Sequence, residues 1–243
     1  MFAGHRLSGV RQRWWSRELA TVVVVATILP NSGLRASNPL TLEEMGPKPE
    51  IRSMTIHRIR LLGDPVLRAR CETIARPKST AVRVIADDLR ETLRDWQSRF
   101  GSGRAIAAPQ IGAPVRIVQV EMDRPWTLIN PEIVDIGTED FTVWDDCFSF
   151  PNLLVRVQRA CHIRVRYEDL KGEVQEIDLE RDMAELLQHE IDHLDGVLAV
   201  DRACGSDPFC LREEWNRLYT ASDRYGEPEQ RSEQVPTPLS APL

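Results

Sequence analysis

The chain has 243 residues, of which 42% are hydrophobic and 28% charged, a composition that excludes a wholly disordered, collagenous or multiply membrane-spanning protein. The net charge of -6 argues against direct nucleic-acid binding, because contacts to phosphate need a basic surface. Five cysteines are too few for a disulfide scaffold, and the odd number argues against complete pairing. We therefore expect cysteines that are buried, free or bound to metal.

Residues 1–53 differ in charge from the rest of the chain. They hold seven Lys/Arg and four Asp/Glu, whereas the other 190 residues hold 24 and 33. Four arginines precede an apolar run over residues 19–30, which resembles a secretory signal but is too short to span a membrane. A transit-like leader and a mis-assigned start, with Met54 as the first residue, are the alternatives. Residues 1–53 are expected to be leader and linker, and membrane association is expected only if the leader is retained.

The apolar pattern predicts one domain over residues 54–225. Apolar residues at steps of three and four predict a helix over residues 80–100, and further helices are expected over 181–195 and 211–225. Strands are predicted over residues 115–121, 126–136, 162–167 and 174–179, the second broken by Pro131 and the last two joined as a hairpin. Strands clustered before a late helix favour an α+β domain. Residues 226–243 lack a periodic apolar face, so a disordered tail is expected.

The sharpest motif, His189-Glu190-Ile191-Asp192-His193, lies inside the predicted helix 181–195. Residues four apart share one face of a helix, so the two imidazoles can bind one metal while Glu190 acts on a metal-bound water. A solvated polar helix face is the alternative. A catalytic metal also needs a third protein ligand, for which the candidates are Cys147, Cys161, Cys204, Cys210, Glu185 and the remaining histidines. A lone cysteine that binds no metal is expected to be a small buried hydrophobic residue. We favour this interpretation for Cys71, Cys161, Cys204 and Cys210.

Three motifs in this order resemble those of the peptide deformylase family. They are Gly-Arg-Ala-Ile-Ala-Ala-Pro-Gln at residues 103–110, Asp-Asp-Cys-Phe-Ser at 145–149 and Gln-His-Glu-Ile-Asp-His at 188–193. Residues 62–68 also resemble the start of that family, and the resemblance extends over about residues 54–201. It implies a compact α+β domain with antiparallel sheets around a central HExxH metal-binding helix.

The resemblance also implies a metal and a reaction. Cys147, His189 and His193 would hold one divalent metal, natively Fe(II), for which Zn(II) or Ni(II) can substitute. Glu190 would take a proton from the attacking water and pass it to the leaving amine. The expected reaction removes the N-formyl group from the N-terminal methionine of nascent polypeptides, near the ribosome in the cytoplasm, and releases formate. An exported or organelle-targeted enzyme is the alternative if the leader is real.

Further site residues follow from the same resemblance. The Gln110 side-chain amide and the Phe148 backbone N–H are expected to stabilise the oxyanion. The residues expected to bind substrate are Gly103, Ala105, Ile106, Asp145, Glu185 and Leu186.

The chain departs from the family pattern at several of these positions. Asp145-Asp146 replaces Glu-Gly, and the extra carboxylate is expected to strengthen metal retention or raise the pKa of the bound water. Ala105 replaces a glycine, which restricts the backbone and is expected to alter peptide docking. Arg159 is expected to pair with Asp145, the alternative being a solvated arginine.

Glu185 is the most suggestive departure, because the family has an apolar residue there. A carboxylate in an apolar pocket is costly unless paired. We expect Glu185 to turn to solvent, to pair with an arginine such as Arg156, or to make the pocket select a polar or cationic side chain. Two alternative functions stay open: a metal amidohydrolase acting on another N-formyl or N-acyl amine, and a non-catalytic binding homologue.

Overall fold

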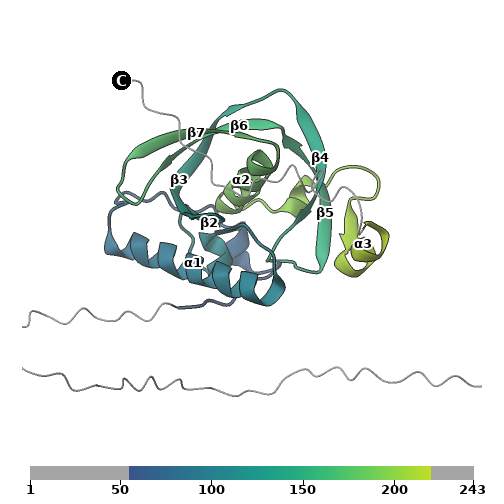
Figure 1. The fold of residues 1–243 in the computed structure, drawn as a ribbon, viewed down its shortest axis with the longest axis horizontal. Coiled ribbons are helices and arrows are strands. Elements are labelled where there is room, and N and C mark those ends of the chain that lie inside the picture. The colour runs from purple at the N-terminus through teal and green to yellow at the C-terminus, as the bar shows by residue number, and fades with distance from the viewer. Residues whose placement is uncertain (1–54, 220–243) are drawn as a thin grey trace, which may run out of the picture. The chain divides into compact units, whose positions relative to one another are not determined.

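The computed structural model describes residues 55–219 (Figure 1), so the expected leader over 1–53 and tail over 226–243 lie outside it. Within this range helices combine with antiparallel sheets, which confirms the α+β class. The elements, with η for a short 3-10 helix, are η1 (Pro65–Arg68), α1 (Thr80–Phe100), β1 (Ala105–Ala107), η2 (Ala108–Ile111), β2 (Ile117–Glu121), β3 (Pro125–Ile136), β4 (Asp140–Asp146), β5 (Leu153–Ala160), β6 (His162–Glu168), β7 (Val174–Glu180), α2 (Arg181–Leu194), η3 (Ala199–Arg202), β8 (Phe209–Leu211) and α3 (Arg212–Tyr219).

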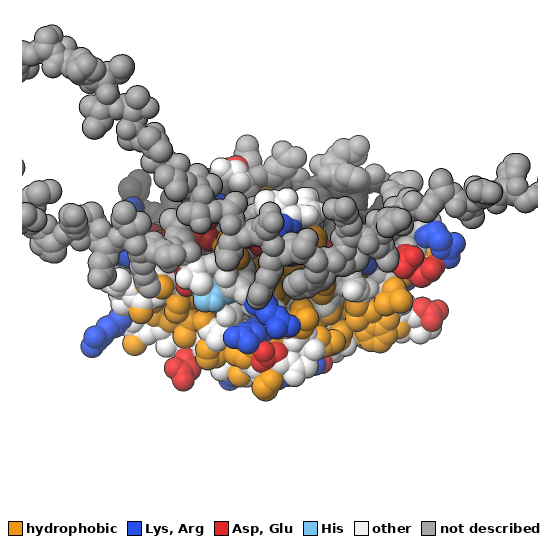
Figure 2. Space-filling model, turned by 90° about the horizontal axis from the view of Figure 1, so that it is seen from below, with side chains coloured by type: hydrophobic (Ala, Val, Ile, Leu, Met, Phe, Trp, Pro, Cys, Tyr) orange, Lys and Arg blue, Asp and Glu red, His pale blue; other side chains and the backbone are white. Residues whose placement is uncertain are grey.

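Helix α1 has a capping residue at each end. The Ser79 hydroxyl accepts a hydrogen bond from the Val82 N–H at the N-terminus, and Gly101 ends the helix in the left-handed conformation. The outer face carries ion pairs three and four residues apart, such as Asp95 with Arg99. Figure 2 shows this face from below, with charges of both signs beside hydrophobic side chains. The opposite face of α1 is apolar and packs on the sheet.

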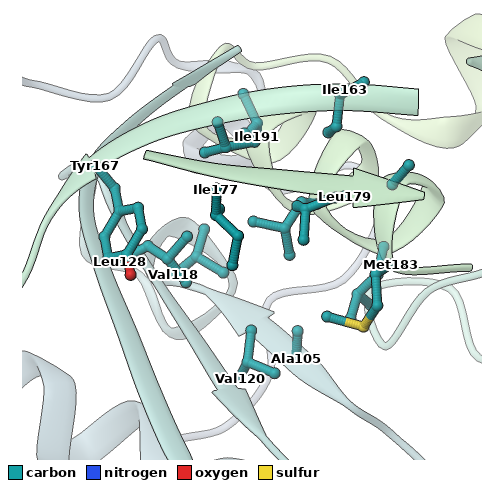
Figure 3. Packing of buried hydrophobic residues seen from close by; sticks show 14 of the residues in the cluster. Ala105, Val118, Val120, Leu128, Ile163, Tyr167, Ile177, Leu179, Met183 and Ile191 are labelled. Atoms are coloured by element: carbon teal, nitrogen blue, oxygen red, sulfur yellow. The ribbon is translucent and has the colours of Figure 1, made fainter. Parts of the chain in front are cut away.

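The five-stranded antiparallel sheet has the order β1-β2-β3-β6-β7 and is covered on both faces in its centre. Ile117 of β2 packs in the cluster formed with α1, while its neighbour Val118 packs in the cluster formed with α2. Figure 3 shows that second cluster, where Met183 and Ile191 of α2 meet side chains from the strands. Because both faces are covered, all five residues of β2 are buried, including the polar Gln119 and Glu121.

The pairing of strand β3 with β6 changes register beside Pro131. The register with β6 shifts between Ile129 and Glu132, and Asn130 takes a φ of 50°. The Asn130 side chain accepts from the Ile74 N–H and donates to the Ile74 carbonyl, at 2.8 and 2.9 Å. Strand β3 thus continues through Pro131, where a break was predicted, and shows a shift of register there; Asn130 also anchors the segment before α1.

A second sheet, in the order β4-β5-β8, was not predicted. Its inward-facing positions include the buried polar residues Asp145 and Arg159, which interrupt the apolar alternation that marks a strand. The short elements β1 and η2, which carry the motif at residues 103–110, were not predicted either. The helix expected over 211–225 begins at Arg212, and its last predicted residues lie outside the described range.

Helix α2 lies at the centre, with strands of both sheets around it (Figure 1). It is buried on its polar face as well as its apolar face. It ends in a Schellman motif: the Gly196 N–H bonds the His193 carbonyl and the Val197 N–H bonds the Asp192 carbonyl. Within residues 55–219 no helix is long and apolar enough to cross a membrane.

We predict that Gly196→Ala destabilises the protein by about 3 kcal/mol. Gly196 has a φ of +74°, and an added Cβ would lie 2.5 Å from the backbone oxygen of Arg68. Gly205→Ala is the matched control, because Gly205 has a φ of +88° but no atom within 4 Å of the new Cβ. It should lose only about 1–2 kcal/mol of backbone strain. Urea denaturation measures both, and equal losses would contradict the close-packing argument.

Candidate metal centre and active site

A cavity of about 780 Å³ opens between the end of α1, the loop before β1, the end of β4 and helix α2. Most of the predicted site residues line it: Gly103, Ala105, Gln110, Asp145, Cys147, Phe148, Glu185, Leu186, His189 and Glu190. His193 lies next to this set at the metal-ligand cluster. Ile106 does not line the cavity, and its fully buried side chain packs in the α1 cluster. The side chain of Ile106 thus faces the core, and substrate binding by this residue stays a prediction.

Cys147, His189 and His193 form a compact, buried group of potential metal ligands. One ligand atom from each lies within 4.8 Å of the other two. The Cys147 Sγ is 3.2 Å from Nε2 of His193. Burial, and the neighbouring His189, hold the pKa of His193 well below its usual range. Against the effect of burial, Asp145 and Cys147 raise the pKa of His189 well above its usual range, so a metal would have to displace a proton from His189. The donor set fits a transition metal such as iron or zinc.

The Asp145 carboxylate fixes the orientation of His189. It contacts Nδ1 of His189 at 2.8 Å and accepts a hydrogen bond from Arg159 at 2.9 Å. Although burial alone would raise it, His189 and Arg159 lower the pKa of Asp145 to about 2. Because Nδ1 is engaged, Nε2 of His189 is left for a metal, and such outer partners tune metal ligands. The predicted pairing of Arg159 with Asp145 is confirmed.

Arg159 extends this network further into α2. Its Nη1 donates to Asp192 at 2.5 Å, and Asp192 also accepts from Arg202 of η3. Arg159 and Asp145 are almost fully buried. The ion pairs thus join β4, β5 and η3 to the metal-binding helix.

Glu190 lines the cavity, and its buried carboxylate lacks a full set of hydrogen bonds within residues 55–219. Its Oε2 is buried and has no hydrogen-bond partner among the described residues. Burial raises the pKa of Glu190 to about 7, and the nearby Asp145 and Glu185 add to the increase although His189 opposes it. A carboxyl group held this way can exchange a proton near neutral pH.

Gln110 is locked in one orientation by the motif that carries it. Its Oε1 accepts from the Ala107 N–H at 2.9 Å, which turns Nε2 toward Cys147 Sγ at 3.5 Å and Ser149 Oγ at 3.4 Å. The amide N–H groups therefore point at the Cys147 thiol and the Ser149 hydroxyl. Ser149 was not predicted as a site residue, and its position two after Cys147 was the available signal.

Gly103 is required by the close approach of Phe148. An added Cβ at Gly103 would lie 2.5 Å from the Phe148 ring, and its φ of +111° disfavours other residues. The Phe148 ring also stacks on Trp96 of α1, with centroids 4.5 Å apart. Trp96 and Phe100 line the cavity beside these residues and were not predicted, because they belong to the apolar pattern of the helix.

Glu185 does not turn to solvent, so that expectation is wrong. It is 4% exposed and lines the cavity. Its partner is Arg104 rather than Arg156: Nη2 of Arg104 donates to Oε2 of Glu185 at 3.3 Å, while Nη1 donates to Asp182 at 3.1 Å. Burial first, and Asp145 second, raise the pKa of Glu185 to about 7 against the effect of Arg104. An arginine within the small-residue motif at 103–108 was the missed signal.

Asp146 turns out to be paired away from the thiolate. Nη2 of Arg212 in α3 donates to its carboxylate at 2.7 Å, which offsets the extra charge expected beside the metal. Among the other cysteines, Cys71 is buried as expected, whereas Cys161, Cys204 and Cys210 are only partly buried.

We predict that Arg159→Met lowers the free energy of unfolding by about 3–5 kcal/mol, because it leaves the buried Asp145 without its arginine. Arg166→Met is the matched control. Arg166 pairs with Glu176 on the exposed surface, where an ion pair contributes at most about 1 kcal/mol. Urea denaturation of both variants tests this, and a loss at Arg159 no larger than at Arg166 would refute it.

Comparison with known proteins identifies the family. A sequence model described as polypeptide deformylase matches residues 56–208. A peptide deformylase of Thermotoga petrophila is 36% identical over 160 residues, covering 65% of this chain and 94% of that protein. The crystal structure of peptide deformylase from Thermotoga maritima matches with a TM-score of 0.58 at 35% identity, covering 62% of this chain and 99% of that one. A Met-Ala-Ser-bound class I type b peptide deformylase from Acinetobacter baumannii matches with a TM-score of 0.57 at 26% identity, covering 61% and 99%. With its motifs gathered in one cavity and its relatives matched over nearly their whole length, the chain belongs to the polypeptide deformylase family.

Proposed function

We propose that this chain is a metal-dependent hydrolase that removes the formyl group from the N-terminal methionine of nascent polypeptides and releases formate. The observation that carries the proposal is the cluster of Cys147, His189 and His193 beside Glu190, whose buried Oε2 has no hydrogen-bond partner within residues 55–219. The Acinetobacter baumannii relative bound to Met-Ala-Ser supports a peptide substrate that begins with methionine.

Cys147, His189 and His193 would hold the metal. One thiolate and two imidazoles leave a coordination position open for water or substrate. We infer Fe(II) as the native ion, with Zn(II) or Ni(II) as substitutes. When bound, the ion supplies Lewis-acid polarisation and lowers the pKa of water.

Glu190 acts as the general base and then as the general acid. It takes a proton from the water that attacks the formyl carbon, and it gives a proton to the amine as the carbon–nitrogen bond breaks. The products are formate and a peptide with a free N-terminus. Its buried carboxylate, free of any hydrogen bond at Oε2 among the described residues, has no competing partner for this proton.

Gln110 stabilises the oxyanion that develops on the formyl oxygen. The Ala107 N–H holds its amide so that the Nε2 hydrogens face the cavity before substrate arrives. Preorganised donors of this kind need no rearrangement during the reaction. The Phe148 backbone N–H is the proposed second donor.

The peptide docks along β1, which is the edge strand of the five-stranded sheet. Gly103 and Ala105 line the cavity at this edge, and an extended peptide can add to it as a further strand. Leu186 supplies apolar surface to the same cavity. Nascent chains as substrates place the activity in the cytoplasm, near the ribosome.

The direct test is formate release by the full-length protein, purified anaerobically and loaded with Fe(II) or Ni(II), on formyl-Met-Ala-Ser. Turnover is expected. Stoichiometric metal without formate release would overturn the proposed function.

Glu190→Ala should retain the metal and lose activity by about 10²–10⁴-fold, the usual contribution of a general base. Formate release and elemental analysis on the same sample separate the two effects. Full-rate turnover by the variant would remove the base assignment.

Cys147→Ala should lose the metal, because two imidazoles alone bind it weakly at this site. Cys161→Ala is the control, since Cys161 lies outside the ligand cluster and is only partly buried. Elemental analysis after dialysis should find metal in the control alone. Full occupancy in Cys147→Ala would exclude this cysteine as a ligand.

A further inference from the structure

The wall of the cavity around Glu185 carries charges that the proposed reaction does not use. Glu185 and His189 are four residues apart on α2, so they share one face about 6 Å apart along the axis. A carbonyl held beside His189 places an extended side chain of four or five atoms within reach of Glu185. This carboxylate is thus positioned to contact the first side chain of a peptide.

Glu185 is incompletely neutralised by its protein partner. Arg104 divides its guanidinium between Asp182 at 3.1 Å and Glu185 at 3.3 Å, so one arginine faces two buried carboxylates. The contact to Glu185 uses only Oε2. Asp182 does not line the cavity, whereas Glu185 and Arg104 do. Glu185 therefore presents to the substrate side a carboxyl group that Arg104 engages through one oxygen.

An apolar side chain placed here would remove water from a carboxylate without replacing its hydrogen bonds, which is unfavourable. A side chain with a terminal N–H group would instead supply the missing donor. Leu186, the neighbour of Glu185, contributes aliphatic surface to the same cavity. Such a wall suits a side chain with an aliphatic stem and a donor at its tip, such as lysine or glutamine.

We propose that Glu185, held by Arg104, is a specificity determinant that extends the accepted first residues beyond methionine to side chains that donate a hydrogen bond or carry positive charge. This inference rests on the proposed function, because it concerns the substrate range of the same deformylation. The substrate class is N-formyl peptides whose first side chain is long and ends in a donor.

The test compares formyl-Lys-Ala-Ser and formyl-Gln-Ala-Ser with formyl-norleucine-Ala-Ser, whose side chain is of similar length but has no donor. The metal-loaded full-length protein should show a higher kcat/KM for the lysine peptide than for the norleucine peptide. Glu185→Leu should lower this ratio by roughly 10- to 100-fold, the range expected for losing a hydrogen bond to a charged group. A ratio unchanged within about twofold would overturn the proposal.

Two further variants separate specificity from structure. Glu185→Gln removes the charge but keeps an acceptor. It should therefore lower kcat/KM for the lysine peptide, relative to the norleucine peptide, more than it lowers kcat/KM for the glutamine peptide. Glu176→Gln is the matched control: Glu176 pairs with Arg166 on the exposed surface, outside the cavity, and its change should leave both ratios unchanged. If Glu185 were only structural, its substitution would reduce the turnover of all peptides by the same factor. Equal reductions would therefore count against the proposal.

The outcome also distinguishes this inference from the proposed function. Turnover of formyl-Met-Ala-Ser with unaltered ratios in Glu185→Leu would sink the specificity proposal alone. Absence of formate from every peptide would sink the proposed function. In that case calorimetric dissociation constants of the same peptides supply the ratio, and equal affinities for the lysine and norleucine peptides would overturn the specificity proposal as well.

Discussion

The buried ion network centred on Arg159 is the constraint on which the active site depends. Arg159 bonds Asp145 at the end of β4 and Asp192 on α2, and Asp145 in turn holds His189. Burying these charges is expensive, and well-packed apolar residues in their place are often equally stable. The network is therefore better explained by the geometry that it imposes: it sets the ring of His189 against the end of β4, next to Cys147.

The same network explains why α2 is buried on its polar face. A helix normally buries one apolar stripe and leaves its charged face to water. Here Met183 and Ile191 fill the core against the five-stranded sheet, while the opposite face meets β4, β5 and the cavity. The second sheet thus serves mainly to cover and satisfy the polar side of one helix.

Sequence patterns predicted the parts of the fold where periodicity and burial agree. Helix α1, the hairpin of β6 and β7 and the HExxH helix all follow a regular apolar repeat. The β4–β5 hairpin was missed because Asp145 and Arg159 occupy inward positions that would normally be apolar. Local rules tend to fail at functional sites, since the residues there are selected for chemistry. Similarly, Glu185 was misplaced because its partner, Arg104, is 81 residues away in sequence.

The two ends of the cavity differ in how tightly hydrogen bonds fix their polar side chains. At the reaction end, His189 and Gln110 each have a short hydrogen bond that fixes their orientation, so their ligating and donating atoms are set before substrate binds. At the Glu185 end, one arginine is shared by two carboxylates through longer contacts. A rigid reaction end requires an invariant substrate group, which is the formyl amide. Glu185, which shares its arginine, can exchange partners. Substitutions at this end of the cavity are consequently expected to change the range of substrates without altering the chemistry.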